Sequence, residues 1–284
     1  MAVITIIGSG MMGSALAFPA RENGNEVRLV GTHLDREIIE ACWKTNRHPK
    51  FTKDFPEGVK YYQIEEFKEA LIDTDVVIGG PCTSYELVAH DQTEVAFCGK
   101  DREVLSYLKS LMQTDYYHIS TTTDVTGIES AVALKNGYAL GIALTIGLNQ
   151  KLFQSDELHF NSQAAVFGQA SKEMYKLLNF QGALSLENLS VGIGDLYVTV
   201  YGGRTRLVGI LLGKGLNIDE AKAELNGVTL ESLVVSERVA RAVKRNIEKG
   251  VLKEEDFPLL LHIDEILSKK TAVAIPWEKF TFAL

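Results

Sequence analysis

The sequence predicts an α/β protein in which a doubly wound parallel sheet precedes an all-α C-terminal domain. Three observations support this prediction. Short apolar runs alternate with helix-like segments in the first part of the chain, a glycine-rich turn follows the first apolar run, and helical periodicity dominates from Ile128 onward. The 284 residues are enough for two domains with cores of their own. We expect the boundary near Asp124, which gives domains 1–124 and 125–284.

The first element is the β-branched apolar run 2–7, which leads directly into GSGMMG. A helix-like segment that closes at Gly24 follows, and 26–31 reads as a second strand. In this strand–turn–helix–strand context, G-x-G-x-x-G predicts a dinucleotide-binding domain of the Rossmann type. The alternative is a glycine turn in another kind of α/β protein.

Each residue type in this turn has a physical purpose. Gly8 permits the tight turn, Gly10 lets the backbone approach a pyrophosphate, and Gly13 permits close packing of helix on strand. The phosphates then lie at the N-terminus of the helix, where free N–H groups favour anions. The predicted cofactor-binding residues of the turn are Gly8, Ser9, Gly10, Met11, Met12 and Gly13.

The end of the second strand bears on the choice between NAD and NADP. An NAD site usually carries an acidic residue there, but the sequence from Gly31 reads GTHLDR, with no acid directly after the strand. Thr32, His33 and Arg36 are candidates to hold a 2′-phosphate, and Asp35 is a candidate N-cap of the next helix. We therefore expect NAD(P)H as cofactor, with a preference for NADP(H).

The remaining elements follow from hydrophobic periodicity. Strands are predicted at 59–64, 75–80 and 93–99 and from 116, and helices at 35–45, 64–74 and 101–112. In the second domain, helices are predicted at 128–148, 161–179, 204–213, 219–226, 230–249 and 254–268.

The second domain places two charged residues in apolar surroundings. Lys135 lies in the helical run AVALKN, and Asp195 lies between glycine and leucine in GIGDLYVTVYGGRTR. A lysine that loses its hydration needs a partner or a ligand, which makes Lys135 a candidate proton donor. For Lys135 the alternative is a side chain that reaches water from the edge of its helix. For Asp195 it is a residue in a turn or at an N-cap, and for Arg204 and Arg206 it is a solvated surface position.

Composition excludes several other functions. The net charge of −8 argues against binding to nucleic acid or to an anionic membrane. Cys42, Cys82 and Cys98 have no metal-binding or disulfide spacing, so we expect free thiols and no metal. No signal peptide and no apolar run of membrane-spanning length is apparent, so we expect a cytoplasmic protein.

Several motifs follow one another along the chain: GSGMMGSALA, a Gly-Pro pair followed five residues later by Glu86, TTDVTGIESAVALKN, GIGDL, and GGRTR-x-x-G before LLGKG. This ordered series resembles the NAD(P)-dependent glycerol-3-phosphate dehydrogenase family. The resemblance covers nearly the whole chain. It implies an oxidoreductase that interconverts dihydroxyacetone phosphate and glycerol 3-phosphate with NAD(P)H. It also implies a supply of precursor for glycerolipid and phospholipid synthesis, and a homodimer.

The resemblance also implies a role for each matching residue. Lys135 would protonate the carbonyl oxygen as hydride arrives, and Asp195 would pair with this lysine and help to hold the triose hydroxyls. Arg204 would bind the substrate phosphate, with Thr205 where the family usually has asparagine. The implied residues are Lys135 and Asp195 for catalysis, Asn136, Arg204 and Thr205 for the substrate, and Thr32, His33, Arg204 and Glu231 for the cofactor.

One departure from the family is large. Between Gly80 and Pro81 the family carries a further segment of several dozen residues, with a strand and a lysine, and none of it is present here. Because of this departure, one alternative function is that of a catalytically degenerate homologue that binds NAD(P) without turnover. A reductase of a carboxylated ketone, similar to ketopantoate reductase, is the other alternative.

Overall fold

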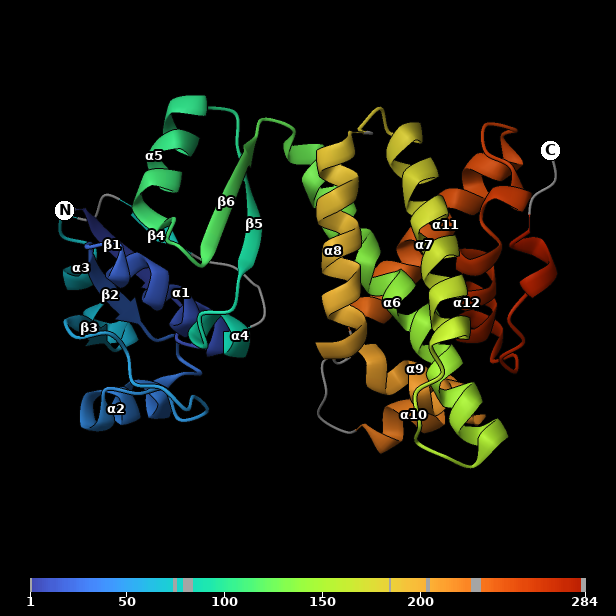
Figure 1. The fold of residues 1–284 in the computed structure, drawn as a ribbon, viewed down its shortest axis with the longest axis horizontal. Helices are drawn as coiled ribbons and strands as arrows, with labels where there is room; N and C mark the ends of the chain where they lie inside the picture. The colour runs from blue at the N-terminus through green and yellow to red at the C-terminus, as the bar shows by residue number, and fades with distance from the viewer. Residues whose placement is uncertain are drawn as a thin grey trace. The chain divides into compact units, whose positions relative to one another are not determined.

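The computed structural model describes residues 2–73, 76–78, 84–183, 185–202, 205–225 and 231–281. The chain divides between Val125 and Thr126 into two compact units. The first unit combines strands and helices, and the second is helical, so the predicted fold class is confirmed (Figure 1).

The first unit is built on a parallel sheet in the order β3-β2-β1-β4. Its strands are β1 (Val3–Ile7), β2 (Glu26–Val30), β3 (Val59–Tyr62) and β4 (Val76–Ile78). A helix connects β1 to β2 and another connects β2 to β3, so the sheet has the Rossmann-type winding. This order brings the glycine turn after β1 to the middle of the sheet.

Two further strands form a second parallel sheet. β5 (Thr93–Cys98) and β6 (Tyr117–Thr122) pair along their whole length, and within the described residues they pair only with each other. The helices of the unit are α1 (Met11–Glu22), α2 (Arg36–Thr45), α3 (Phe67–Ala70), α4 (Ser84–Val88) and α5 (Arg102–Met112).

The helix predicted at 64–74 is shorter than the apolar periodicity suggests. The segment forms a 3₁₀ turn, Ile64–Glu66, followed by the four residues of α3. Glu66 accepts the backbone N–H of Gln63 at 2.8 Å, so its side chain closes the turn at the start of the segment. Asp73 has a φ of +55°, a left-handed conformation that ends the helical path before β4.

The second unit consists of helices around the long helix α6 (Val125–Phe153) (Figure 1). Among the described residues α6 is the one helix that is long and apolar enough to cross a bilayer, which the sequence reading did not anticipate. However, 72% of its most apolar stretch is buried inside the unit, as in the core helix of a soluble protein. The other helices are α7 (Phe160–Phe180), α8 (Leu186–Gly202), α9 (Thr205–Lys214), α10 (Ile218–Glu224), α11 (Glu231–Glu248) and α12 (Pro258–Lys269).

Small residues allow α9 to cross α6 at backbone distance. A Cβ added at Gly213 would lie 2.3 Å from the carbonyl oxygen of Leu144. A Cβ added at Gly147 would lie 2.1 Å from the carbonyl oxygen of Ile210. Because no side chain fits between the two backbones, the glycines fix where α9 crosses α6.

The segment that contains GIGDL is a helix, which is missing from the helices predicted from the sequence. Asp195 lies in the interior of the 17-residue helix α8, so the turn and N-cap readings of this residue are wrong. Glycine lowers helix propensity by about 1 kcal/mol per residue, but tertiary packing overrides such preferences. Gly192 and Leu196 are buried in α8, and this packing face supports the helix.

A buried carboxylate joins two helices of the second unit. Glu173 on α7 is fully buried and accepts the backbone N–H groups of Leu259 and Leu260 at 2.8 and 3.0 Å. These groups belong to the first turn of α12, which begins with Pro258 and has no side-chain cap of its own. Glu173 therefore caps α12 from a different helix.

Candidate cofactor and catalytic sites

The glycine turn of the first unit has the geometry that a dinucleotide needs. Gly8 has a φ of +98°, and its N–H donates to the carbonyl of Val30 at 2.9 Å. A Cβ added at Gly13 would lie 1.9 Å from the carbonyl oxygen of Gly8, so only glycine lets α1 pack this closely. Gly10 precedes α1, and a Cβ there would meet open space. The open side of the turn leaves room for a phosphate group.

The N-terminus of α1 adds an electrostatic preference for anions. Met11 and Met12 open the helix, and its first turn contains no acidic residue. The hydroxyl of Ser14 donates to the carbonyl of Ser9 at 2.9 Å and holds the turn against the helix. The first N–H groups of a helix have no acceptor within it, so these residues fit the pyrophosphate of a dinucleotide.

Asp35 ties the glycine turn to the end of β2. Its carboxylate accepts the backbone N–H of Thr32 at 2.9 Å, the hydroxyl of Thr32 at 2.8 Å and the backbone N–H of Ser9 at 3.2 Å. Asp35 occupies the N-cap position of α2, but its side chain makes no capping hydrogen bond. The expectation that it caps this helix is therefore wrong, and sequence reasoning missed its link to the turn.

The three residues predicted to hold a 2′-phosphate, Thr32, His33 and Arg36, differ in their interaction partners. The hydroxyl of Thr32 donates to Asp35, and Arg36 forms an ion pair with Glu65 on the surface. Both partners of this ion pair are exposed, so it is weak and exchangeable. His33 is exposed at the tip beyond β2. Arg36 can therefore exchange Glu65 for another anion, and the side chain of His33 is accessible from solvent.

In the second unit, α6 and α8 bring Lys135 and Asp195 together. The ammonium Nζ of Lys135 donates to Oδ2 of Asp195 in an ion pair. The side chain of Lys135 is 17% exposed and that of Asp195 is 31% exposed, so the pair is partly sheltered but open to solvent. A small ligand can reach both groups, and their charges remain balanced when it is absent.

The neighbours of this pair are apolar or small. Ala131 and Leu134 are buried on α6, and Asn136 is half-buried beside Lys135. A Cβ added at Gly137 would lie 3.0 Å from the hydroxyl oxygen of the buried Ser236 on α11. α11 therefore supports α6 next to the ion pair.

Arg204, which is predicted to bind the substrate phosphate, lies outside the described residues. The side chain of Glu231, predicted for the cofactor and the first residue of α11, is not described either. Thr205 is the first residue of α9 and is 7% exposed. The neighbouring Arg206 has a buried Nε with no hydrogen-bond partner among the described residues. This unsatisfied donor at the start of a helix suits an anion.

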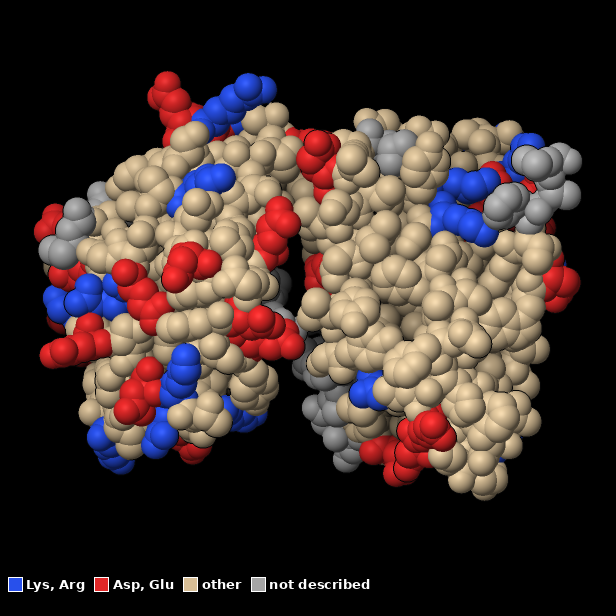
Figure 2. Space-filling view, viewed as in Figure 1, with Lys and Arg blue, Asp and Glu red and all other residues tan. Residues whose placement is uncertain are grey.

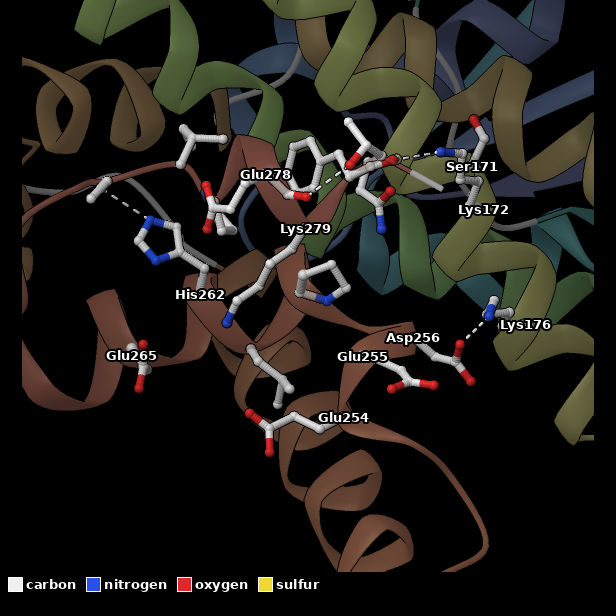
Figure 3. Close-up of a pocket in the computed structure, with 18 of the residues that line it drawn as sticks. Ser171, Lys172, Lys176, Glu254, Glu255, Asp256, His262, Glu265, Glu278 and Lys279 are labelled. Carbon is white, nitrogen blue, oxygen red and sulfur yellow. Dashed lines mark hydrogen bonds and ion pairs between the residues drawn. The ribbon is translucent and has the colours of Figure 1, made fainter. Parts of the chain in front are cut away.

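A large pocket in the helical unit lies elsewhere. It has a volume of about 1530 Å³ and is lined by α7, α12 and the segment after α12, and neither Lys135 nor Asp195 borders it. Figure 3 shows its charged side chains, among which Lys176 pairs with Asp256. Lys172 donates to the carbonyl of Phe280 at 3.1 Å. Lys172 and Lys176 thus have protein partners, and the pair Lys135–Asp195 lies away from this pocket.

The visible surface carries charges of both signs. Figure 2 shows acidic and basic side chains interspersed over the first unit, whereas the visible face of the helical unit is mostly uncharged. Large apolar side chains of the helical unit are exposed, including Phe160, Leu186 and Tyr197. Exposed apolar side chains of this size are common where proteins associate.

Solved structures share this fold. Glycerol-3-phosphate dehydrogenase from Coxiella burnetii superposes with a TM-score of 0.71 at 21% identity, over 98% of this chain and 97% of that one. Glycerol-3-phosphate dehydrogenase from Plasmodium falciparum gives a TM-score of 0.74 at 17% identity, over 95% and 92% of the two chains. The two likenesses establish the fold.

Curated relatives extend over most of the sequence. The NADP(+)-dependent glycerol-3-phosphate dehydrogenase of Archaeoglobus fulgidus is 28% identical over 78% of this chain and 83% of its own. The glycerol-3-phosphate dehydrogenase [NAD(P)+] of Staphylococcus aureus is 25% identical over 96% of both chains.

The Staphylococcus aureus alignment also bears on the segment missing from this chain. It runs over 335 positions, whereas this chain has 284 residues, so at least 51 aligned positions have no residue here. The junction between Gly80 and Pro81, where we expect the gap, lies outside the described residues.

Two family models divide the chain between them. The N-terminal model of NAD-dependent glycerol-3-phosphate dehydrogenase matches residues 3–126, and the C-terminal model matches residues 124–276. Together they cover both structural units and confirm the resemblance of the motifs. The chain belongs to the NAD-dependent glycerol-3-phosphate dehydrogenase family, whose members are oxidoreductases that use NAD(P).

Proposed function

We propose that this chain interconverts dihydroxyacetone phosphate and glycerol 3-phosphate, with Lys135 and Asp195 as its catalytic residues. The observation that carries the proposal is the ion pair between these residues, which lie on different helices of the matched family domain. Partial exposure leaves the ammonium accessible to a substrate, while the carboxylate fixes its direction.

The proposed chemistry follows from charge. When the cofactor is bound, its reduced nicotinamide supplies a hydride to the carbonyl carbon of the ketone. Negative charge then develops on the carbonyl oxygen, and the ammonium of Lys135 stabilises it and donates a proton. Asp195 keeps the ammonium oriented and balances its charge. In the reverse direction the neutral amine of Lys135 accepts the proton of the alcohol.

The start of α9 is the proposed position of the substrate phosphate. Thr205 supplies a buried hydroxyl, and Arg206 supplies an Nε donor without a partner among the described residues. Arg204 is proposed to complete the site because paired N–H donors suit a phosphate. Asn136 is proposed to contact the substrate from α6. Arg204 and Glu231 are also proposed to contact the cofactor.

The cofactor is proposed to lie on the glycine turn, with its pyrophosphate at the N-terminus of α1. The positive φ of Gly8 and the close contact at Gly13 support this placement. A preference for NADP(H) is proposed from the tip beyond β2, where His33 and Arg36 are exposed. Comparison of KM for NADPH and NADH tests this preference, and a lower KM for NADH contradicts it.

The central experiment follows nicotinamide absorbance with dihydroxyacetone phosphate as substrate. The intact protein is expected to turn over, and Lys135→Ala is expected to lose at least about 10³-fold in kcat through loss of the proton donor. Lys176→Ala, which removes a lysine paired with Asp256 outside the site, is the matched control. Turnover by Lys135→Ala at the rate of the intact protein contradicts the assigned role.

A panel of ketones tests the substrate class. Phosphorylated ketones are expected to react faster than carboxylated ones, since the cationic groups near the start of α9 fit a phosphate. Strong preference for a carboxylated ketone contradicts the phosphate assignment. Binding of NAD(P)H without turnover of any phosphorylated ketone contradicts the proposed reaction and identifies a degenerate homologue, in line with the shorter chain.

The cellular setting is also part of the proposal. We place the enzyme in the cytoplasm, as a homodimer without stable membrane insertion or nucleic-acid binding, where it supplies glycerol 3-phosphate for glycerolipid and phospholipid synthesis. Exposed apolar side chains on α8, such as Leu186 and Tyr197, support self-association. Light scattering after size-exclusion chromatography tests the dimer, and a monomeric mass contradicts it.

A further inference from the structure

Gly192 lies on α8 one helical turn before Asp195. It faces Ala131, which lies one helical turn before Lys135 on α6. A Cβ added at Gly192 would lie 3.0 Å from the Cβ of Ala131 and 3.3 Å from its carbonyl oxygen. Packed carbon atoms are most stable about 3.5–4.0 Å apart. Glycine therefore allows α8 to approach α6 more closely than alanine does.

This close contact is coupled to the ion pair by helix geometry. From the contact to the ion pair, the chain rises about 6 Å along α6 and about 4.5 Å along α8, because each residue of a helix advances about 1.5 Å. On both helices, the path from the close contact to the ion pair leads toward the C-terminus of the helix. The separation of the helices at Gly192 and Ala131 thus sets the separation of Asp195 and Lys135 one turn later.

The backbone of Lys135 is affected as well. In an α-helix the carbonyl of a residue accepts the N–H of the residue four positions later, so Ala131 is the acceptor for the peptide N–H of Lys135. A Cβ at Gly192 would press on that same carbonyl oxygen. Any adjustment of α6 at this point therefore moves the turn that carries Lys135.

A third neighbour does not impose the same constraint. The Cε atom of Met174 on α7 would lie 2.9 Å from a Cβ at Gly192. Met174 is fully buried, but Cε is the end of a flexible side chain that can adopt another rotamer. The atoms that cannot move aside belong to the backbone and the Cβ of Ala131.

We propose that Gly192 is a positioning residue for the reaction: the close approach of α8 to α6 at Gly192 and Ala131 holds Asp195 where it fixes the ammonium of Lys135. This inference rests on the proposed function, in which Lys135 donates the proton. Reaction rates depend steeply on such geometry, since a displacement of 1 Å can cost about 100-fold.

The first experiment replaces Gly192 with alanine. Gly192→Ala is expected to lower kcat about 10- to 100-fold and to shift the pH profile of kcat, because the ammonium is less well held. The KM for NAD(P)H is expected to stay within about twofold, since the glycine turn belongs to the other unit. Gly168→Ala, in the middle of α7, is the matched control because its added Cβ meets open space. Its kcat is expected to be unchanged.

The second experiment removes the opposing Cβ. The double variant Ala131→Gly with Gly192→Ala relieves the 3.0 Å contact and is expected to recover kcat to within about threefold of the intact protein. This variant also decides the matter if Gly192→Ala alone does not fold. Circular dichroism checks the folding of each variant.

The outcomes separate the two proposals. A folded Gly192→Ala with unchanged kcat and pH profile overturns the positioning role. A folded double variant that stays inactive overturns it as well, because the damage then does not come from the contact with Ala131. Lys135→Ala with full turnover overturns instead the proposed function, whatever Gly192 does.

Discussion

Lys135 and Asp195 lie 60 positions apart in the chain, yet their side chains form an ion pair between α6 and α8. Asp195→Asn keeps the size of the side chain and an acceptor oxygen but removes the negative charge. We expect kcat to fall about 100-fold because the ammonium loses its charge partner and its fixed direction. Steady-state kinetics at saturating cofactor measure the effect.

A surface ion pair in the same unit provides the control. Asp256→Asn removes the partner of Lys176, and both side chains of that pair are partly exposed. Its kcat is expected to match that of the intact protein because this pair lies away from Lys135 and Asp195. Exposed ion pairs contribute less than about 1 kcal/mol to stability, so the fold is also expected to be retained. Equal effects of Asp195→Asn and Asp256→Asn are the result that contradicts a specific role for Asp195.

Asp35 gives a prediction for cofactor affinity. Asp35→Ala removes the acceptor that links Thr32 and Ser9, so the glycine turn loses its connection to the end of β2. We expect Kd for NAD(P)H to rise at least about tenfold because two backbone donors lose their partner. Isothermal titration calorimetry measures Kd directly. Glu37→Ala removes an exposed acid of α2 and is expected to leave Kd unchanged; equal affinities for all three proteins contradict the prediction.

Glu173 makes the stability of the protein depend on pH. Burial raises the pKa of its carboxyl from 4.5 to about 7, although Gln169, Leu259 and Leu260 donate hydrogen bonds to it. Between pH 4.5 and about 7, the carboxyl of Glu173 is protonated in the folded state but ionised in the unfolded state. The free energy of unfolding therefore falls as pH rises through this range. The total change is up to about 3 kcal/mol, and it ends above the pKa of the folded state.

Glu173→Gln is expected to remove this component. The two N–H groups at the start of α12 bind different oxygens of Glu173, so the single carbonyl oxygen of glutamine still accepts one of them. Its amide does not titrate. Urea denaturation at a series of pH values measures the free energy of unfolding for both proteins. Glu254→Gln, an exposed carboxylate, is the control. Curves for Glu173→Gln and the intact protein that stay parallel between pH 4.5 and about 7 speak against the assignment.

The crossing of α6 and α9 gives a prediction for stability. Gly147→Ala places a Cβ 2.1 Å from the carbonyl oxygen of Ile210, so the two backbones must separate. We expect a loss of about 3 kcal/mol in the free energy of unfolding. Gly168→Ala meets open space and is expected to stabilise the protein by up to about 1 kcal/mol through higher helix propensity. Chemical denaturation compares them, and equal stabilities for these two variants rule out close crossing at Gly147.

The sequence by itself determined the elements whose cause is local. The turn between Gly8 and Gly13 could be recognised because its glycine positions are fixed by one strand, one turn and one helix. The two structural units and most helices could also be predicted, since hydrophobic periodicity is a property of short segments. Lys135 and Asp195 could be named as candidates because charge in an apolar run needs compensation.

Only the tertiary structure decided how these residues meet. The alternative reading of Asp195 was a turn or N-cap, but its segment is a helix that packs Gly192 against Ala131 and brings Asp195 to Lys135. The carboxylate of Asp35 bonds to Ser9, 26 positions away, instead of capping its own helix. In both cases the deciding contact joins residues that are distant in sequence, and patterns of neighbouring residues do not encode such contacts.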